Sequence, residues 1–146
     1  MRFWDASALV PLVVREPRTR GMQKLAVRDP ELVLWWGTPV ECSGALCRLV
    51  RDAVMTERER RKAAALLDEV FAAAAEILPT ADLRARAVRL LSVHPLRAAD
   101  SLQLAAALAW CHESPAGAEF VCLDSRLSRA AAREGFTVLP EQSLDE

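Results

Sequence analysis

The sequence predicts a three-layer α/β/α sandwich with a central, mostly parallel sheet. Short apolar segments alternate with longer amphipathic ones along the chain, which is the pattern of repeated β–α–β units. The segment 31–36 is apolar on both faces, as expected for a strand that helices cover on either side. The chain has 146 residues, 52% of them hydrophobic, which is enough for one domain with a sizeable core. We expect this domain to span residues 1–140, with a polar tail at 141–146.

Strands are expected where short apolar runs stop at a turn or at a helix cap. They cover residues 2–4, 31–36, 76–79, 119–123 and 136–139. Asp5 and Asp124 follow the first and fourth runs, and an aspartate in that place is a good cap for the next helix. Pro140 closes the last run, because proline has no N–H to donate to a sheet.

Helices are expected where apolar residues recur with helical spacing behind a capping residue or a proline. They cover residues 6–14, 17–28, 39–54, 57–75, 81–93, 97–112 and 126–134. Pro17 opens the second helix, and Thr38 is the expected cap of the third, with Pro39 in its first position. Thr56 and Glu59 form a capping box in front of the fourth helix.

The later helices are bounded in the same way. Thr80 caps the fifth helix, His94-Pro95 breaks it, and Gly135 ends the last one. The inward stripe of the fifth helix is expected to contain Leu83, Ala87, Leu90 and Leu91. That of the sixth helix is expected to contain Leu104, Ala107, Leu108 and Cys111.

Composition excludes several classes of protein. The net charge of −1 is not that of a protein that binds nucleic acid through a general positive charge. No apolar run is long enough to span a bilayer, and Asp5 stands where a secretory signal would be apolar, so we expect a cytoplasmic protein without a membrane segment.

Trp35 and Trp36 are expected in a buried strand, as core or interface residues. The cysteines are expected to be reduced core thiols: Cys42, Cys47, Cys111 and Cys122.

Four carboxylates break the rule that acidic side chains lie on solvated faces. Each lies beside apolar sequence in the first turn of an expected helix, and these residues are Asp5, Glu41, Asp100 and Asp124. Three of them follow expected strands, and ligands of parallel sheets gather at the carboxyl ends of the strands. Taken singly, these three can each be explained as a helix cap or a capping-box residue, because negative charge is favourable at a helix start.

Asp100 resists the capping explanation. It lies four residues before Leu104 and eight before Leu108, so it extends the buried stripe of its own helix. Four converging acids would repel one another unless a divalent cation lay between them. Oxygen ligands favour Mg²⁺ or Mn²⁺ over zinc, and neither His94 nor His112 has the spacing of a metal-binding pair. Such a site could activate water for the hydrolysis of a phosphodiester.

Three further residues are candidates for contacts with a phosphate. Ser7 could hydrogen-bond Asp5 or a phosphate, or it could be an ordinary hydroxyl of the first helical turn. Arg97 and Arg126 lie close in sequence to acids of the set, and a solvated or ion-paired role explains them as well. Of the basic residues 17 are Arg and two are Lys, which fits either biased codon usage or the binding of phosphate by Arg.

The segments around the four acids resemble the motifs of PIN-domain ribonucleases. The matching segments are Phe3-Trp4-Asp5-Ala6-Ser7-Ala8-Leu9, Thr38-Pro39-Val40-Glu41, Leu96-Arg97-Ala98-Ala99-Asp100-Ser101-Leu102-Gln103-Leu104-Ala105 and Phe120-Val121-Cys122-Leu123-Asp124-Ser125-Arg126-Leu127. They cover nearly the entire chain in the family's order, and the length is similar to that of VapC-type toxins of bacterial toxin–antitoxin pairs. Cys122 departs from the family, which often has Ser or Thr at this position.

This resemblance implies an Mg²⁺-dependent endoribonuclease that leaves 5′-phosphate and 3′-hydroxyl ends. It implies that Asp5, Glu41, Asp100 and Asp124 form an acidic quartet that holds the metal and positions water. It also implies a homodimer and an antitoxin whose tail blocks the acidic groove. An alternative is a non-catalytic module of the same fold that binds RNA or a protein. A phosphatase or receiver domain fits less well, because neither Asp5-Ala6-Ser7 nor the position of Lys62 matches its motifs.

Overall fold

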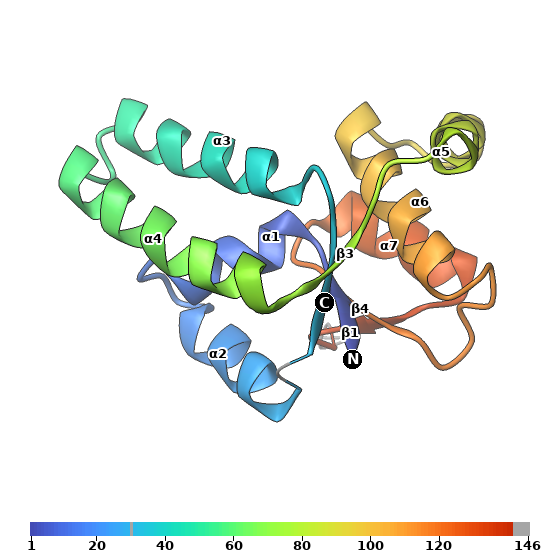
Figure 1. Ribbon diagram of the computed structural model, residues 1–146, viewed down its shortest axis with the longest axis horizontal. Helices are drawn as coiled ribbons and strands as arrows, with labels where there is room; N and C mark the ends of the chain where they lie inside the picture. The colour runs from blue at the N-terminus through green and yellow to red at the C-terminus, as the bar shows by residue number, and fades with distance from the viewer. Residues whose placement is uncertain (30, 142–146) are drawn as a thin grey trace, which may run out of the picture.

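The computed structural model describes residues 1–29 and 31–141 and has three layers, with a parallel sheet between two layers of helices (Figure 1). The strand order is β3-β2-β1-β4-β5, and each neighbouring pair is parallel. The strands are β1 (Arg2–Trp4), β2 (Leu32–Trp35), β3 (Ala75–Ile77), β4 (Glu119–Val121) and β5 (Thr137–Leu139). The predicted fold class is therefore confirmed. Of the predicted tail, residues 142–146 lie outside the part of the chain that the structure describes.

Helices cover both faces of the sheet. They are α1 (Ala6–Leu9), the 3₁₀ helix η1 (Val10–Leu12), α2 (Thr19–Arg28), α3 (Thr38–Arg51), α4 (Glu57–Ala73), α5 (Ala81–Val93), α6 (Ala98–Trp110) and α7 (Ser125–Glu134). Figure 1 shows α1 to α4 on one side of the sheet and α5 to α7 on the other. None of the helices described here combines the length and hydrophobicity needed to cross a bilayer.

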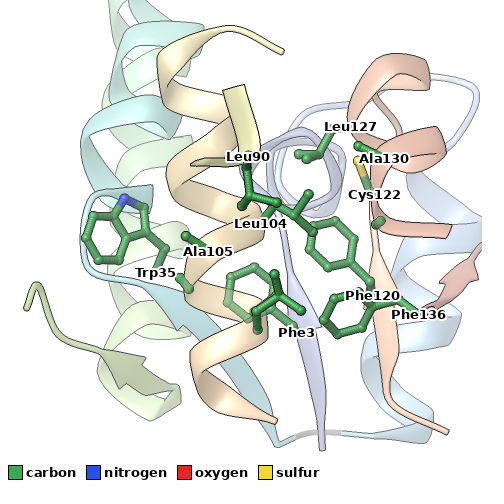
Figure 2. Packing of buried hydrophobic residues seen from close by; sticks show 14 of the residues in the cluster. Phe3, Trp35, Leu90, Leu104, Ala105, Phe120, Cys122, Leu127, Ala130 and Phe136 are labelled. Atoms are coloured by element: carbon green, nitrogen blue, oxygen red, sulfur yellow. The ribbon is translucent and has the colours of Figure 1, made fainter. Parts of the chain in front are cut away.

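The core has two halves because neighbouring residues of a strand point to opposite faces of the sheet. On one face, Phe3 and Phe120 stack with their ring centroids 5.3 Å apart, and Leu104 of α6 packs in the same cluster (Figure 2). On the other face, Trp4 and Val121 pack with residues of α1 to α4. The sheet is thus apolar on both sides, and polar side chains can gather only where its strands end.

Several helix boundaries differ from the prediction, two of them for reasons that the structure shows. The first helix stops at Leu9 instead of Val14, because Pro11 cannot donate the next helical hydrogen bond, and the chain continues as η1. The second begins at Thr19 instead of Pro17. The third ends at Arg51, because Ala53 adopts a positive φ of 56° that no α-helix accommodates.

Two side chains predicted to be buried are exposed. Leu91 is 41% exposed, because the inward stripe of α5 consists of Leu83, Ala87 and Leu90 and leaves Leu91 at its edge. Trp36 is 53% exposed, because β2 ends one residue before it. The cysteines are free thiols, as predicted, and each is buried or partly buried.

The start of α4 allows a direct test of a predicted cap. Thr56 Oγ1 accepts a hydrogen bond from the Glu59 N–H at 3.1 Å, and Glu59 Oε1 accepts one from the Thr56 N–H at 3.2 Å. We expect Thr56→Ala to lower the free energy of unfolding by about 1 kcal/mol, measured by denaturant titration. Ser43→Ala, on the exposed face of α3, is the control and should change it by less than about 0.5 kcal/mol. Equal effects of the two substitutions would contradict the capping role.

Candidate active site

The four predicted acids come together beyond the carboxyl ends of the strands. Asp5 directly follows β1, Asp124 precedes α7 after β4, Glu41 lies in the first turn of α3, and Asp100 lies in the first turn of α6. Burial raises the pKa of Asp5, Glu41 and Asp100, and the charge of a neighbouring acid raises it further. The neighbour is Asp100 for Asp5, both of these for Glu41, and Asp124 for Asp100. The acids therefore lie close enough to repel one another.

Asp5 is the most deeply placed of the four, with 3% of its surface exposed. Its Oδ2 accepts hydrogen bonds from the Ser7 N–H at 3.1 Å, from the Ser7 hydroxyl and from the Cys122 thiol at 3.5 Å. Burial nevertheless dominates, so the pKa of Asp5 is raised. Among the residues that the structure describes, no basic side chain forms an ion pair with Asp5. A buried carboxylate without a cation is unfavourable, and a bound metal ion would change that.

Cys122 supplies a donor at the position where the sequence departs from the family pattern. Its sulfur lies 3.7 Å from Ser7 Oγ, and its thiol hydrogen has two acceptors at 3.5 Å, Asp5 Oδ2 and the Asp124 carbonyl oxygen. Burial and the charge of Asp5 raise the pKa of this thiol. Cys122 therefore stays protonated at neutral pH and has a hydrogen to donate to Asp5 or to the Asp124 carbonyl.

Backbone N–H groups at the starts of α6 and α7 donate hydrogen bonds to Asp100 and Asp124. Asp124 Oδ1 accepts from the Leu127 N–H at 2.8 Å and caps α7, so its capping role is real. Asp100 Oδ2 accepts from the Arg97 N–H at 3.4 Å and lies 4.0 Å from Arg97 Nε. The Arg97 side chain is 77% exposed, so this pair adds little stability. The pKa of Asp100 is raised by burial and by Asp124, and the positive charges of Arg97 and Arg126 oppose the rise only partly.

Glu41 is not a capping-box residue, and the prediction that Thr38 caps α3 is wrong. The cap position belongs to Gly37, where an added Cβ would lie 2.5 Å from Trp35 Nε1. The helix starts one residue earlier than predicted, so Thr38 lies inside α3. Thr38 Oγ1 instead accepts a hydrogen bond from Gln103 Nε2 at 3.0 Å. The capping explanation for Glu41 is thereby removed.

Gln103 is a residue of this site that the sequence analysis missed. Its Nε2 also donates to Glu41 Oε1 at 3.1 Å, and its side chain is fully buried. Burial and the charges of Asp5 and Asp100 raise the pKa of Glu41 to about 7, although the bond from Gln103 opposes the rise. The available signal was a carboxamide inside the run 102–109, whose other residues are all Leu or Ala.

The charge of the site fits a divalent cation, but the acids do not form a closed cage. Within residues 1–29 and 31–141, no group of three or more His, Cys, Asp or Glu side chains is arranged to hold a metal ion. Mg²⁺ commonly keeps several of its waters and takes only one or two carboxylates directly, so such a cage is not required. The donors at the site are carboxylate oxygens, which suit Mg²⁺ or Mn²⁺.

Two solved structures share the fold of this chain. The toxin VapC20 of Mycobacterium tuberculosis, which cleaves the sarcin-ricin loop, has a TM-score of 0.65 and 20% sequence identity over 89% of this chain and 95% of its own. The chain has the same PIN-like fold as this toxin. FitAcB from Neisseria gonorrhoeae has a TM-score of 0.64 and 16% identity over 94% of this chain and 96% of its own. No family model and no curated protein matches the sequence. At these identities the likeness shows the PIN-like fold alone.

Proposed function

We propose that this protein is a metal-dependent endoribonuclease and the toxin of a toxin–antitoxin pair. The observation that carries the proposal is the mutual repulsion of the four acids. In the described part of the chain, the exposed Arg97 is the only basic residue that forms an ion pair with one of them. VapC20, which has a similar fold, is a toxin that cleaves the sarcin-ricin loop. An acidic site at the strand ends of this fold is suited to the same class of chemistry.

The residues of the site have distinct parts in this proposal. Bound Mg²⁺ would polarise a phosphoryl oxygen of the substrate and lower the pKa of a water. Asp5, Glu41, Asp100 and Asp124 would hold the ion directly or through its waters, and Glu41 would also orient the attacking water. The hydroxyl of Ser7 would fix Asp5, to which it already donates. Arg97 and Arg126 would bind substrate phosphate beside Asp100, since both lie near enough to lower the pKa of Asp100.

An antitoxin is the expected protein partner. An apolar groove of about 690 Å³ lies between α2 and α4, and its lining includes Val27, which is 81% exposed, and Leu66, which is 46% exposed. Apolar side chains at such a groove suit a partner helix. We extend the proposal to a homodimer in the cytoplasm, where RNA is available. Sedimentation of the purified protein, alone and with the product of the neighbouring gene, would test both assemblies.

Metal removal tests the proposed chemistry. We expect the purified protein to cleave RNA that contains a sarcin-ricin loop, or total RNA, in Mg²⁺ or Mn²⁺. EDTA should reduce cleavage to background, and added Mg²⁺ should restore it. The new ends should carry 5′-phosphate and 3′-hydroxyl groups. Equal cleavage with and without EDTA would contradict the proposal, and Mn²⁺ binding without cleavage of any RNA would favour a non-catalytic module of this fold.

A further inference from the structure

We propose that Gln103 is a positioning residue that holds Glu41 against the repulsion of the other acids. The inference rests on the proposed function, because it assigns Glu41 to a working metal site. Gln103 lies within the third segment that resembles the PIN-domain motifs, but neither the four acids nor the comparisons give it a role. It follows from a buried carboxamide on α6 whose donor group bonds Glu41 and Thr38 and whose oxygen has no partner in the part of the chain described.

The orientation of the carboxamide follows from its partners. Nε2 carries two hydrogens and meets two acceptors, Thr38 Oγ1 at 3.0 Å and Glu41 Oε1 at 3.1 Å. If the amide were turned around, its oxygen would face the Glu41 carboxylate, which only accepts hydrogen bonds when it is charged. The nitrogen of Gln103 therefore belongs on the side of Glu41.

The oxygen of the carboxamide indicates that packing alone does not explain a glutamine at this position. Gln103 Oε1 is buried and, among the described residues, has no hydrogen-bond partner. A leucine or methionine would fill the same position without burying an unpaired oxygen. The surrounding run of Leu and Ala shows that α6 is otherwise apolar here. The two hydrogen bonds that the amide nitrogen makes account for a glutamine here, despite its unpaired oxygen.

The bond to Glu41 links two helices that carry acids of the site. Gln103 lies one helical turn after Asp100 on α6, whereas Glu41 lies on α3. The charges of Asp5 and Asp100 act on Glu41 and favour its displacement towards solvent. Gln103 is the only side chain of the described residues that donates a hydrogen bond to Glu41. Without it, the flexible Glu41 side chain would be free to leave the site.

A purely structural role would consist of the bond to Thr38, which also joins α3 to α6. Thr38 is fully buried, and Thr38→Val removes its hydroxyl while keeping its shape. This substitution leaves the bond between Gln103 and Glu41 available. Thr38→Val is therefore the matched control, and Gln103→Met, which keeps the length of the side chain without its donor, is the test.

The experiment measures Mn²⁺ affinity by electron paramagnetic resonance, the melting temperature, and kcat and KM for RNA cleavage. We expect Gln103→Met to weaken Mn²⁺ binding and lower kcat by about 10- to 100-fold, with KM for RNA and the melting temperature little changed. Thr38→Val should retain wild-type Mn²⁺ affinity and kcat. A Gln103→Met protein that binds Mn²⁺ and cleaves RNA like the wild type would overturn the inference. If Gln103→Met fails to fold, the double variant Thr38→Val/Gln103→Leu, which removes both polar partners together, takes its place.

Crystal structures of the wild type and of Gln103→Met separate this inference from the proposed function. A wild type that neither binds Mn²⁺ nor cleaves RNA overturns the proposed function. The place of the Glu41 side chain then decides the present inference on its own. A Glu41 carboxylate that leaves its wild-type position in Gln103→Met supports positioning, and one that stays in place overturns it.

Discussion

Asp100→Asn is expected to slow RNA cleavage by about 100- to 1000-fold while the protein remains folded. Asparagine keeps the shape of aspartate but removes the charge that would hold the metal. Asp100 is the acid whose charge reaches both Asp5 and Glu41, and whose own pKa is raised by burial and by Asp124. Removing a group that stabilises charge at a reacting centre costs about 100- to 1000-fold in rate. Initial rates of cleavage in Mg²⁺ would measure the loss, and circular dichroism would confirm that the variant is folded.

Asp82→Asn is the matched control for this experiment. Asp82 also lies in the first turn of a helix, α5, but it is exposed. The two substitutions therefore make the same chemical change at the same kind of position. We expect the Asp82 variant to cleave RNA at the wild-type rate. An Asp100→Asn protein that is as active as the Asp82 variant would rule out Asp100 as a member of the proposed metal site.

Elements whose signals are local could be predicted from the sequence. The capping box of Thr56 and Glu59 forms as predicted, because its two hydrogen bonds join residues three apart. Thr80 caps α5 through the Leu83 N–H at 3.0 Å for the same reason. Gly135 ends α7 with a φ of 112°, which glycine adopts readily. The order of the strands is not a local property. The type of sheet could still be predicted, because covered apolar strands that alternate with helices leave few arrangements besides a parallel sheet.

Features that depend on distant contacts could not be predicted in the same way. Thr38 carries an ordinary capping signal, yet its hydroxyl bonds Gln103 from a distant helix. Sequence spacing identified acids near one another, but it held no information about which buried side chain would hold Glu41. That information lies in the hydrogen bonds that Gln103 of α6 makes to Thr38 and Glu41 at the start of α3.

The cluster of acids has a consequence for stability that can be derived from its pKa values. Burial and neighbouring negative charge raise the pKa of Glu41 from 4.5 to about 7, and the pKa values of Asp5 and Asp100 are raised as well. Between about pH 4.5 and about pH 7, the folded protein therefore binds more protons than the unfolded chain does. The acids destabilise the metal-free fold progressively as pH rises through this window. By contrast, the hydrogen bond from Arg60 lowers the pKa of Glu57. The contribution of Glu57 to stability is therefore complete above about pH 4.5 and is lost as the pH falls below that value.

The metal-free protein should accordingly have a lower melting temperature at about pH 7.5 than at about pH 5, and Mg²⁺ should reverse this trend. Protons and Mg²⁺ compete for the same carboxylates, so the stabilisation by Mg²⁺ should grow as pH rises. Melting temperatures measured in EDTA and in Mg²⁺ at both pH values would show this. Asp5→Asn removes the most deeply buried charge, so it should raise the melting temperature in EDTA at the higher pH and reduce the gain from Mg²⁺. A metal-free protein that becomes more stable across this pH range would mean that the acids are neutralised in some other way, and a metal would not be needed to bring them together.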